Sequence, residues 1–251
     1  MLSPTITMKE SCRMPEEEIY FWSSDENSEW GEIRTNQFKV NPKLNKRFWV
    51  VDNFYDDPLA VRNFALAQTY YPGEGAVGSR TRKQYFFKGV VEQFEEIMGK
   101  EIKRDGDHGW YMPGINGRFQ WSPAGTTQVY HCDEQQYAGM VFLTPDSPPE
   151  CGTGFFRCKK THRRHSQEIN WGAGEGGIVF PGDTFLDPTR YELVDKVGNV
   201  FNRLVIFDGG LIHSALNYFG SNIGNSRLHH MFFFNCVGEE RTNIHDAPKA
   251  Y

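Results

Sequence analysis

The first clear apolar patterns of the chain predict one strand followed by two helices. The run RFWVVDNFYDDP (47–58) is typical of a strand that ends in a turn rich in Asp and Pro. In residues 58–69 the apolar side chains recur three and four positions apart, which indicates a helix with Pro58 in its first turn. The same spacing in VVEQFEEIMGKEI (90–102) predicts a second helix, which Gly99 closes.

From about residue 115 the pattern changes to short apolar runs separated by turn residues, which is typical of an antiparallel β-body. The predicted strands lie in GRFQW (117–121), TTQVYHCD (126–133), AGMVFLTP (138–145), GTGFFRC (152–158), GGIVFPGDTF (176–185), RLVIFDGGLIHSA (203–215) and RLHHMFFFNC (227–236). Together with the helices before them, these strands predict an α+β fold that is mainly β. We expect one domain over residues 46–251, with the polar residues 1–45 laid over it as an arm.

The composition narrows the classes of function. Lys and Arg number 27 against 32 Asp and Glu, a net charge of −5, which gives no overall attraction to nucleic acid or to an anionic membrane. The five cysteines include no C-x-x-C pair, which argues against a disulfide framework and favours a reducing compartment. Because the sequence shows no signal-peptide pattern and no run of about 18 apolar residues, we expect a soluble, cytoplasmic protein.

Two metal-capable side chains lie inside the predicted strand TTQVYHCD. Side chains alternate faces along a strand, so His131 and Asp133 should project to the same side. An imidazole nitrogen and a carboxylate oxygen suit a first-row divalent metal, and His213, after the apolar run 204–207, is the candidate third ligand. A buried histidine that is hydrogen-bonded to an aspartate would give the same pair, so the pair alone leaves a structural role open.

The order of the motifs resembles that of the Fe(II)/2-oxoglutarate-dependent dioxygenases, and within them the prolyl-4-hydroxylase-like group with its bacterial and phage relatives. The resemblance covers about residues 47–236. It rests on FWVVDNFYDD, on HCD followed by YAGMVFLTP, on CGTGFF, on NRLVIFDGGLIHSA and on an arginine after the second histidine. It implies a double-stranded β-helix, or jelly roll, with supporting N-terminal helices and with iron near its open end.

The resemblance also implies a reaction and a set of ligands. His131, Asp133 and His213 are the expected Fe(II) ligands, and the expected reaction is hydroxylation of an unactivated C–H bond with 2-oxoglutarate and O2 as co-substrates. Ascorbate is expected as a supporting reductant. Arg227 is the expected partner of the distal carboxylate of 2-oxoglutarate, because a guanidinium binds a carboxylate through two parallel N–H bonds.

Further co-substrate contacts are harder to assign. His229 shares a face with Arg227 and could extend the carboxylate site, whereas His230 should face away; a structural histidine is the simpler interpretation of each. Relatives commonly offer a tyrosine to 2-oxoglutarate, but GRFQWSPAG has none at the expected strand. Gln120 and Arg118 are weak substitutes.

Three alternatives stay open. A jelly-roll or cupin-like protein could bind metal through the same residues without 2-oxoglutarate, and it would need no arginine that faces the metal. A nucleic-acid demethylase of the same superfamily would need a basic groove, which the charge balance disfavours. The run CGTGFFRCKKTHRRH could bind zinc, although its spacing is unusual and a solvated basic loop is the simpler interpretation. Its four candidate ligands are Cys151, Cys158, His162 and His165.

The sequence leaves the substrate open between two classes. One is a peptidyl side chain such as proline, and the other is a small amino-acid-like metabolite. The basic side chains between residues 157 and 165 could favour an acidic or phosphorylated substrate. Nucleic acid and membrane are not expected as partners, and the oligomeric state is not predicted.

Overall fold

The structure is a computed structural model that describes residues 48–72, 78–166 and 185–239. In this part of the chain it contains two α-helices and ten strands. In chain order the elements are β1 (Phe48–Val51), α1 (Pro58–Leu66), β2 (Tyr70–Pro72), β3 (Ser79–Thr81), α2 (Val90–Met98), β4 (Arg118–Ser122), β5 (Tyr137–Phe142), β6 (Thr153–Cys158), β7 (Tyr191–Val197), β8 (Leu204–Asp208), β9 (His213–Ala215) and β10 (Arg227–Phe234). Short 3-10 helices lie at Pro149–Cys151 and Pro188–Arg190. The fold is therefore mainly β, as the sequence predicts.

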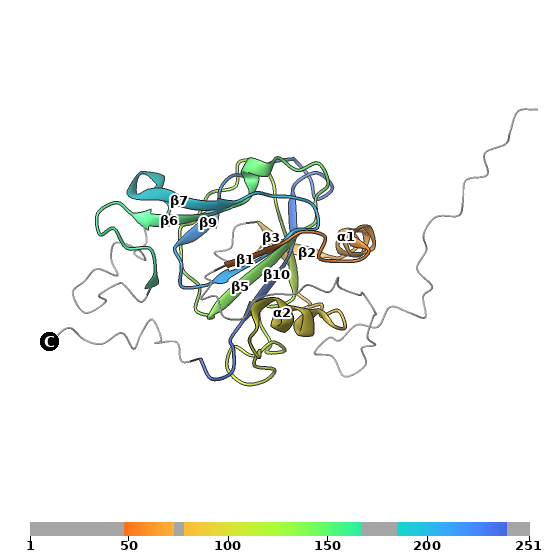
Figure 1. Cartoon of the computed structure of the whole chain (residues 1–251). Helices are drawn as coiled ribbons and strands as arrows, with labels where there is room; N and C mark the ends of the chain where they lie inside the picture. Colours follow the sequence, from red (N-terminus) through yellow and green to blue (C-terminus); the bar gives the residue numbers. More distant parts are fainter. Residues whose placement is uncertain (1–47, 73–77, 167–184, 240–251) are drawn as a thin grey trace, which may run out of the picture.

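The strands form two antiparallel sheets that face each other (Figure 1). The large sheet has the order β1-β8-β5-β10-β4-β3-β2, and the small sheet has the order β7-β6-β9. In Figure 1 the small sheet lies above the large one, and α2 lies below the large sheet. Strands far apart in sequence are neighbours in both sheets, so the site between the sheets depends on long-range pairing.

Strand β10 shows why the large sheet has two different faces. Alternate side chains of a strand point to opposite sides, and here the even-numbered residues from 228 to 234 are buried against the helices. The odd-numbered residues from 227 to 233 line a cavity between the sheets. The same alternation occurs in β8, where Leu204 and Ile206 join the helix side and Val205 and Phe207 join a second apolar cluster. The core therefore lies on one face of the large sheet and the cavity on the other.

The two predicted helices are confirmed, and both cover the core face of the large sheet. Asp57 caps α1 by accepting a hydrogen bond from the Ala60 N–H at 2.9 Å, with Pro58 following as the first helical residue. Helix α2 ends at Gly99, whose φ of 68° is the left-handed conformation that favours glycine. Phe94 of α2 is fully buried against Trp110 and Phe232. The packing of these three rings holds α2 against the core face of the large sheet.

One predicted strand is wrong. Residues 126–133 form no strand, because their backbone groups pair with three separate segments. Tyr130 N–H donates to the Phe185 carbonyl, His131 pairs with His213, and Asp133 N–H donates to the Gly209 carbonyl. The backbone is nevertheless extended enough to keep the predicted alternation of side chains.

Three strands were not predicted, and some predictions cannot be compared. Strands β2 and β3 have three residues each, and β7 exposes most of its residues, so none has a clear apolar alternation. The predicted arm 1–45 and most of the predicted strand 176–185 lie outside the described residues. None of the helices in the described ranges has the length and apolar character needed to cross a lipid bilayer.

Candidate metal centre

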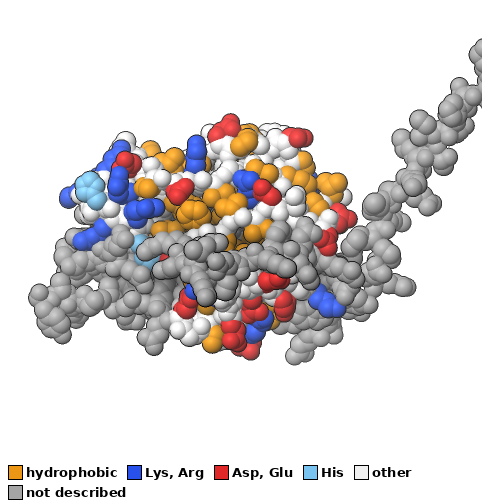
Figure 2. Space-filling view, viewed as in Figure 1, with side chains coloured by type: hydrophobic (Ala, Val, Ile, Leu, Met, Phe, Trp, Pro, Cys, Tyr) orange, Lys and Arg blue, Asp and Glu red, His pale blue; other side chains and the backbone are white. Residues whose placement is uncertain are grey.

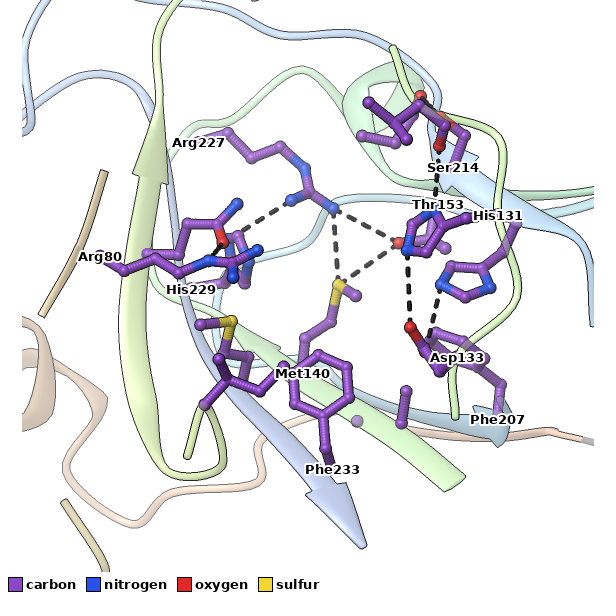
Figure 3. A pocket seen from close by; sticks show the side chains of 18 of the residues that line it. Arg80, His131, Asp133, Met140, Thr153, Phe207, Ser214, Arg227, His229 and Phe233 are labelled. Atoms are coloured by element: carbon purple, nitrogen blue, oxygen red, sulfur yellow. Dashed lines mark hydrogen bonds and ion pairs between the residues drawn. The ribbon is translucent and has the colours of Figure 1, made fainter. Parts of the chain in front are cut away.

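A cavity of about 520 Å³ opens between the two sheets. Its described lining combines metal-capable, cationic and apolar side chains from both sheets and from the loops between them (Figure 3). The residues that matter chemically are Arg80, Gln120, His131, Asp133, Thr153, His213, Tyr218, Arg227 and His229. The apolar wall includes Met140, Phe207, Met231 and Phe233. A volume of this size is typical of a small-molecule site.

His131, Asp133 and His213 come together on one wall of the cavity, as the sequence predicts for a metal site. One potential ligand atom from each lies within 4.8 Å of the others. Nε2 of His131 is 3.5 Å from Oδ1 of Asp133, and Nε2 of His213 is 3.4 Å from Oδ2 of the same carboxylate. These distances are long for hydrogen bonds between charged partners. The carboxylate thus faces both imidazoles across a gap that an ion could fill.

The other nitrogen of each imidazole is held by the backbone. Nδ1 of His131 lies 3.1 Å from the Val129 carbonyl oxygen, and Nδ1 of His213 lies 2.8 Å from the Leu211 carbonyl oxygen. A carbonyl can only accept, so Nδ1 must be the donor in both rings. Neutral imidazoles in this tautomer present a lone pair at Nε2, toward the carboxylate. Such backbone bonds to the far nitrogen are usual for metal-ligating histidines.

Local packing explains how three loop and strand residues meet. His213 begins β9, opposite Phe155 of β6, and its ring packs edge-on against Phe207 with centroids 4.6 Å apart. A Cβ at Gly209 would lie 2.4 Å from the Gln135 carbonyl oxygen and 3.1 Å from the Asp133 Cβ. A glycine at position 209 therefore allows the segment that carries Asp133 to approach β8 closely.

The donor set fits a first-row divalent metal. Two imidazole nitrogens and one carboxylate oxygen are typical ligands of iron, manganese, nickel and zinc, and carboxylate ligation in a half-buried site adds the negative charge that a cation needs. Burial lowers the pKa of His131, but the neighbouring Asp133 carboxylate outweighs burial, and the net shift is upward. Metal binding at Nε2 of His131 would therefore compete with protonation of the same nitrogen.

Arg227 lies across the cavity from the metal-capable wall (Figure 3). It is 3% exposed, and its N–H groups make long contacts of 3.2 to 3.4 Å with the Cys151 carbonyl, His229 Nδ1, Met140 Sδ and Thr153 Oγ1. Among the described residues, no carboxylate pairs with it. Burial lowers the pKa of Arg227. Because the ordinary pKa of a guanidinium lies far above neutral pH, Arg227 keeps its charge. Arg227 is therefore a buried cation that faces a cavity.

His229 and Gln120, the other predicted co-substrate residues, lie beside Arg227. They are directly opposite each other in the pairing of β10 with β4, and both line the cavity. Burial, followed by the charges of Arg227 and Arg80, holds the pKa of His229 well below its usual range. A neutral His229 can accept a hydrogen bond from Arg227 through Nδ1, at 3.3 Å. The structure thus brings the predicted residues to one cavity, while their roles stay predictions.

Two polar residues of the cavity were missed at the level of sequence. Arg80 lies in β3 and donates from Nε to the Gln120 side-chain oxygen. Tyr218 lies in the loop between β9 and β10 and lines the cavity. Burial raises the pKa of Tyr218, and the nearby charge of Arg227 partly offsets this rise. The resemblance predicts a tyrosine near GRFQWSPAG, which contains none, whereas this loop brings Tyr218 to the cavity. No local pattern marks either residue.

The alternative zinc site in residues 151–165 is wrong. Among the residues that the structure describes, the one cluster of three or more metal-capable side chains is that of His131, Asp133 and His213. His165 instead lies 3.0 Å from Asp208, and Cys158 packs in an apolar cluster. Lys159, Lys160 and His162 are exposed. Figure 2 shows Lys and Arg side chains gathered at this end of the molecule, as a solvated basic loop requires.

The chain matches a family model over part of its length and matches no curated protein. A family model described as "Family of unknown function (DUF6445)" matches residues 117–218, a range that includes the three metal-capable residues.

Among solved structures, the chain is similar at low sequence identity to the following three proteins. HygX from Streptomyces hygroscopicus, with nickel, 2-oxoglutarate and hygromycin B bound, has 10% identity and a TM-score of 0.46 over 74% of this chain and 81% of that one. A prolyl-4-hydroxylase from Pseudomonas putida has 16% identity and a TM-score of 0.41 over 76% and 94%. A prolyl hydroxylase from Trichoplax adhaerens, in complex with a hypoxia inducible factor peptide, has 12% identity and a TM-score of 0.38 over 76% and 84%.

Proposed function

We propose that this protein is an oxygenase that uses Fe(II), 2-oxoglutarate and O2 to hydroxylate an unactivated C–H bond. The observation that carries the proposal is the position of Arg227. A buried guanidinium without a carboxylate partner among the described residues faces the same cavity as a His, Asp, His cluster. Burial of an unpaired charge is costly, so an anionic ligand that reaches from the metal to Arg227 would stabilise the site.

Each residue has a defined part in this proposal. His131, Asp133 and His213 would hold iron and leave coordination positions open to other ligands. Arg227 would bind the distal carboxylate of 2-oxoglutarate, with Thr153 and His229 fixing the guanidinium in place. When bound, the iron centre supplies the oxidising chemistry, with 2-oxoglutarate converted to succinate and CO2.

The apolar wall has a separate part. Met140, Phe207 and Phe233 line the cavity, where Met140 contacts Arg227 and Phe207 packs against His213. Apolar side chains here would keep water away from the reacting C–H bond and strengthen the electrostatic contacts of Arg227 and Asp133. In this reading the two antiparallel sheets form a jelly roll within a single domain over residues 46–251, with the site between the sheets.

The competing function is a metal-binding protein that does not use 2-oxoglutarate. It accounts for His131, Asp133 and His213 equally well, but gives no reason for a buried cation on the opposite wall. The two functions therefore differ in one measurable property, which is the affinity of the metal-loaded protein for 2-oxoglutarate.

The test begins with binding under anaerobic conditions. We expect Fe(II) to bind at micromolar concentration, and 2-oxoglutarate then to produce a metal-to-ligand charge-transfer band. Asp133→Ala should lose the metal and the band, because it removes the one carboxylate of the cluster. Arg157→Ala, which breaks an exposed ion pair with Glu192 and changes none of the described cavity-lining residues, is the matched control and should bind as the wild type does.

A second measurement asks for turnover. Aerobic protein with Fe(II), ascorbate and 2-oxoglutarate should form succinate slowly without a substrate, as uncoupled turnover does in the enzymes that this sequence resembles. If metal binds but 2-oxoglutarate neither binds nor decarboxylates, the metal-binding alternative replaces this proposal.

A further inference from the structure

Arg80 gives the cavity a second cation, on a different strand from Arg227. In the large sheet, β3 pairs with β4 and β4 pairs with β10, and Arg80, Gln120 and His229 are direct neighbours across this row. Two strand spacings place the β3 backbone about 10 Å from the β10 backbone. The guanidinium ends of Arg80 and Arg227 nevertheless both point into the cavity (Figure 3). The cavity thus has two separate cationic positions.

Arg80 has no acidic partner in the described part of the protein. Arg80 Nε donates a hydrogen bond to the neutral side chain of Gln120. Burial lowers its pKa, the nearby charge of Arg118 lowers it further, and the charge of Asp133 raises it. The guanidinium is therefore within electrostatic reach of the metal-capable carboxylate. A half-buried cation of this kind is stabilised by an anion that enters the cavity.

With a metal and 2-oxoglutarate bound, the charges in the cavity would not cancel. With a divalent metal bound, the cavity would hold the metal and two guanidiniums against Asp133, which is the one carboxylate among the described lining residues. The dianion of 2-oxoglutarate, bound between the metal and Arg227, leaves one positive charge without an anion. The same cavity must also admit the molecule that is oxidised. A substrate with one anionic group would complete the balance of charge.

The volume agrees with two small ligands. At the roughly 30 Å³ that a water molecule occupies in the liquid, the ten or so non-hydrogen atoms of 2-oxoglutarate fill at most about 300 Å³. The cavity of about 520 Å³ then keeps space for a second small molecule. Arg80, Gln120 and Met231 are among the residues that line this cavity.

We propose that Arg80 binds an anionic group of the primary substrate, so that the molecule oxidised is a small carboxylate or phosphate compound and not an internal residue of a peptide. This inference rests on the proposed function, because it assigns the second cation only after 2-oxoglutarate has taken the first. Gln120 holds Arg80 as a positioning residue, since it accepts from Nε and leaves the terminal N–H groups directed into the cavity.

The experiment measures ligand binding to the anaerobic Mn(II) form by titration calorimetry, first with 2-oxoglutarate alone. The 2-oxoglutarate complex is then titrated with a panel of L-amino acids, 2-hydroxy acids and phosphate monoesters, and with the primary amides of the same acids. A set of peptides with blocked termini forms a third arm. We expect a small anion to bind and its neutral amide to bind roughly ten- to hundredfold more weakly. The acid and phosphate arms separate the two sources of the anion.

Variants assign this preference to Arg80. Arg80→Met should weaken binding of the anion roughly ten- to hundredfold and change 2-oxoglutarate affinity by no more than about threefold, whereas Arg80→Lys should lose less. Arg227→Met should give the reverse pattern. Arg82→Met is the matched control, because Arg82 is exposed and lies over the Tyr71 ring at 3.8 Å. Melting temperature and circular dichroism establish that each variant is folded, and Arg80→Lys serves if Arg80→Met is not.

Three results would overturn the inference while the proposed function stands. In the first, no member of the panel binds although 2-oxoglutarate does. In the second, acids and amides, or acids and blocked peptides, bind equally. In the third, Arg80→Met weakens 2-oxoglutarate as much as Arg227→Met, which would assign Arg80 to the co-substrate. Failure of wild-type protein to bind 2-oxoglutarate would instead overturn the proposed function, and this inference with it.

Discussion

The two faces of β10 differ in chemistry although both are buried. His229 and His230 are neighbours in the chain, with exposures of 3% and 0%. His230 faces the helices, where the Tyr55 hydroxyl lies 2.8 Å from Nδ1 and the carbonyls of Tyr85 and Gly117 lie 3.0 and 3.2 Å from Nε2. His229 faces the cavity, beside two guanidiniums.

Burial alone therefore does not distinguish a structural residue from a functional one. Burial lowers the pKa of His230 to about 3, and its ring is surrounded by aromatic side chains and satisfied by protein groups. On the cavity face, Arg227 is almost as deeply buried, but no acidic group of the described residues neutralises it. A buried polar group with matched partners stabilises the fold, whereas a buried charge without them indicates a ligand.

The largest loss of stability is expected from a substitution on the core face of the large sheet. Phe232→Ala removes a fully buried ring that stacks on Trp110 at 5.3 Å and packs edge-on against Phe94 at 4.9 Å. We expect the free energy of unfolding to fall by about 3–5 kcal/mol, measured from denaturant midpoints. The matched change on the cavity face, Phe233→Ala, should cost about 1 kcal/mol because that ring is only partly buried. Equal losses would mean that the two faces are packed alike.

The next effect comes from removing the buried cation. Arg227→Met keeps much of the side-chain volume but loses the charge, so metal binding should survive while 2-oxoglutarate affinity falls by about 1.5–3 kcal/mol. Because an unpaired buried charge is removed, the ligand-free protein should be no less stable than the wild type. Arg227→Lys should lose less affinity, since an ammonium can still pair with one oxygen. The charge-transfer band of the Fe(II) complex reports the affinity for 2-oxoglutarate. If the wild type, Arg227→Met and Arg227→Lys bind 2-oxoglutarate equally well, Arg227 does not contact the co-substrate.

A third effect depends on pH, at the metal-capable wall. Since the net pKa shift of His131 is upward, protonation of its ring stabilises the metal-free protein below the unfolded pKa of about 6.5, and this stabilisation is lost as pH rises through the folded pKa. Metal binding has the opposite sign, and Mn(II) affinity should rise with pH by up to about tenfold per pH unit below the folded pKa. The His131 side chain is 41% exposed, so solvent screening should keep the stability effect small.

The pH effect is checked by two titrations. Melting temperatures of metal-free wild type and His131→Gln should converge as pH rises from about 6 to about 8.5. Calorimetric Mn(II) affinity over the same range should increase. An affinity that does not vary with pH would show that His131 is not protonated before the metal binds.

The smallest expected effect is that of Tyr218. Its ring is buried in the cavity wall within electrostatic reach of Arg227, and the Phe variant removes only the hydroxyl. If that hydroxyl contacts the bound anion, Tyr218→Phe should weaken 2-oxoglutarate by about 0.5–1.5 kcal/mol and leave metal affinity unchanged. Tyr191→Phe, in the cluster behind His131, is the control and should leave 2-oxoglutarate affinity unchanged. A Tyr218 variant that binds as the wild type does would make the tyrosine part of the wall only.

Features that depend on short-range geometry can be predicted from the sequence alone. Alternation along an extended backbone put His131 and Asp133 on one side and Arg227 and His229 on one face, even though residues 126–133 do not form the predicted strand. Helical spacing, a proline in the first turn and a closing glycine located α1 and α2. These signals act within a few residues, so one sequence is enough to read them.

Which other residues line the cavity with these side chains depends on contacts between segments far apart in the sequence. Arg80 lies in a three-residue strand with no apolar pattern, and it enters the site because β3 pairs with β4 and β4 with β10. Tyr218 comes from a loop, and the zinc alternative fails because Cys158 and His165 are drawn to different partners. Strand pairing and loop placement are set by contacts between distant segments, whose energies depend on the whole packed core and are not encoded in the spacing of any one stretch.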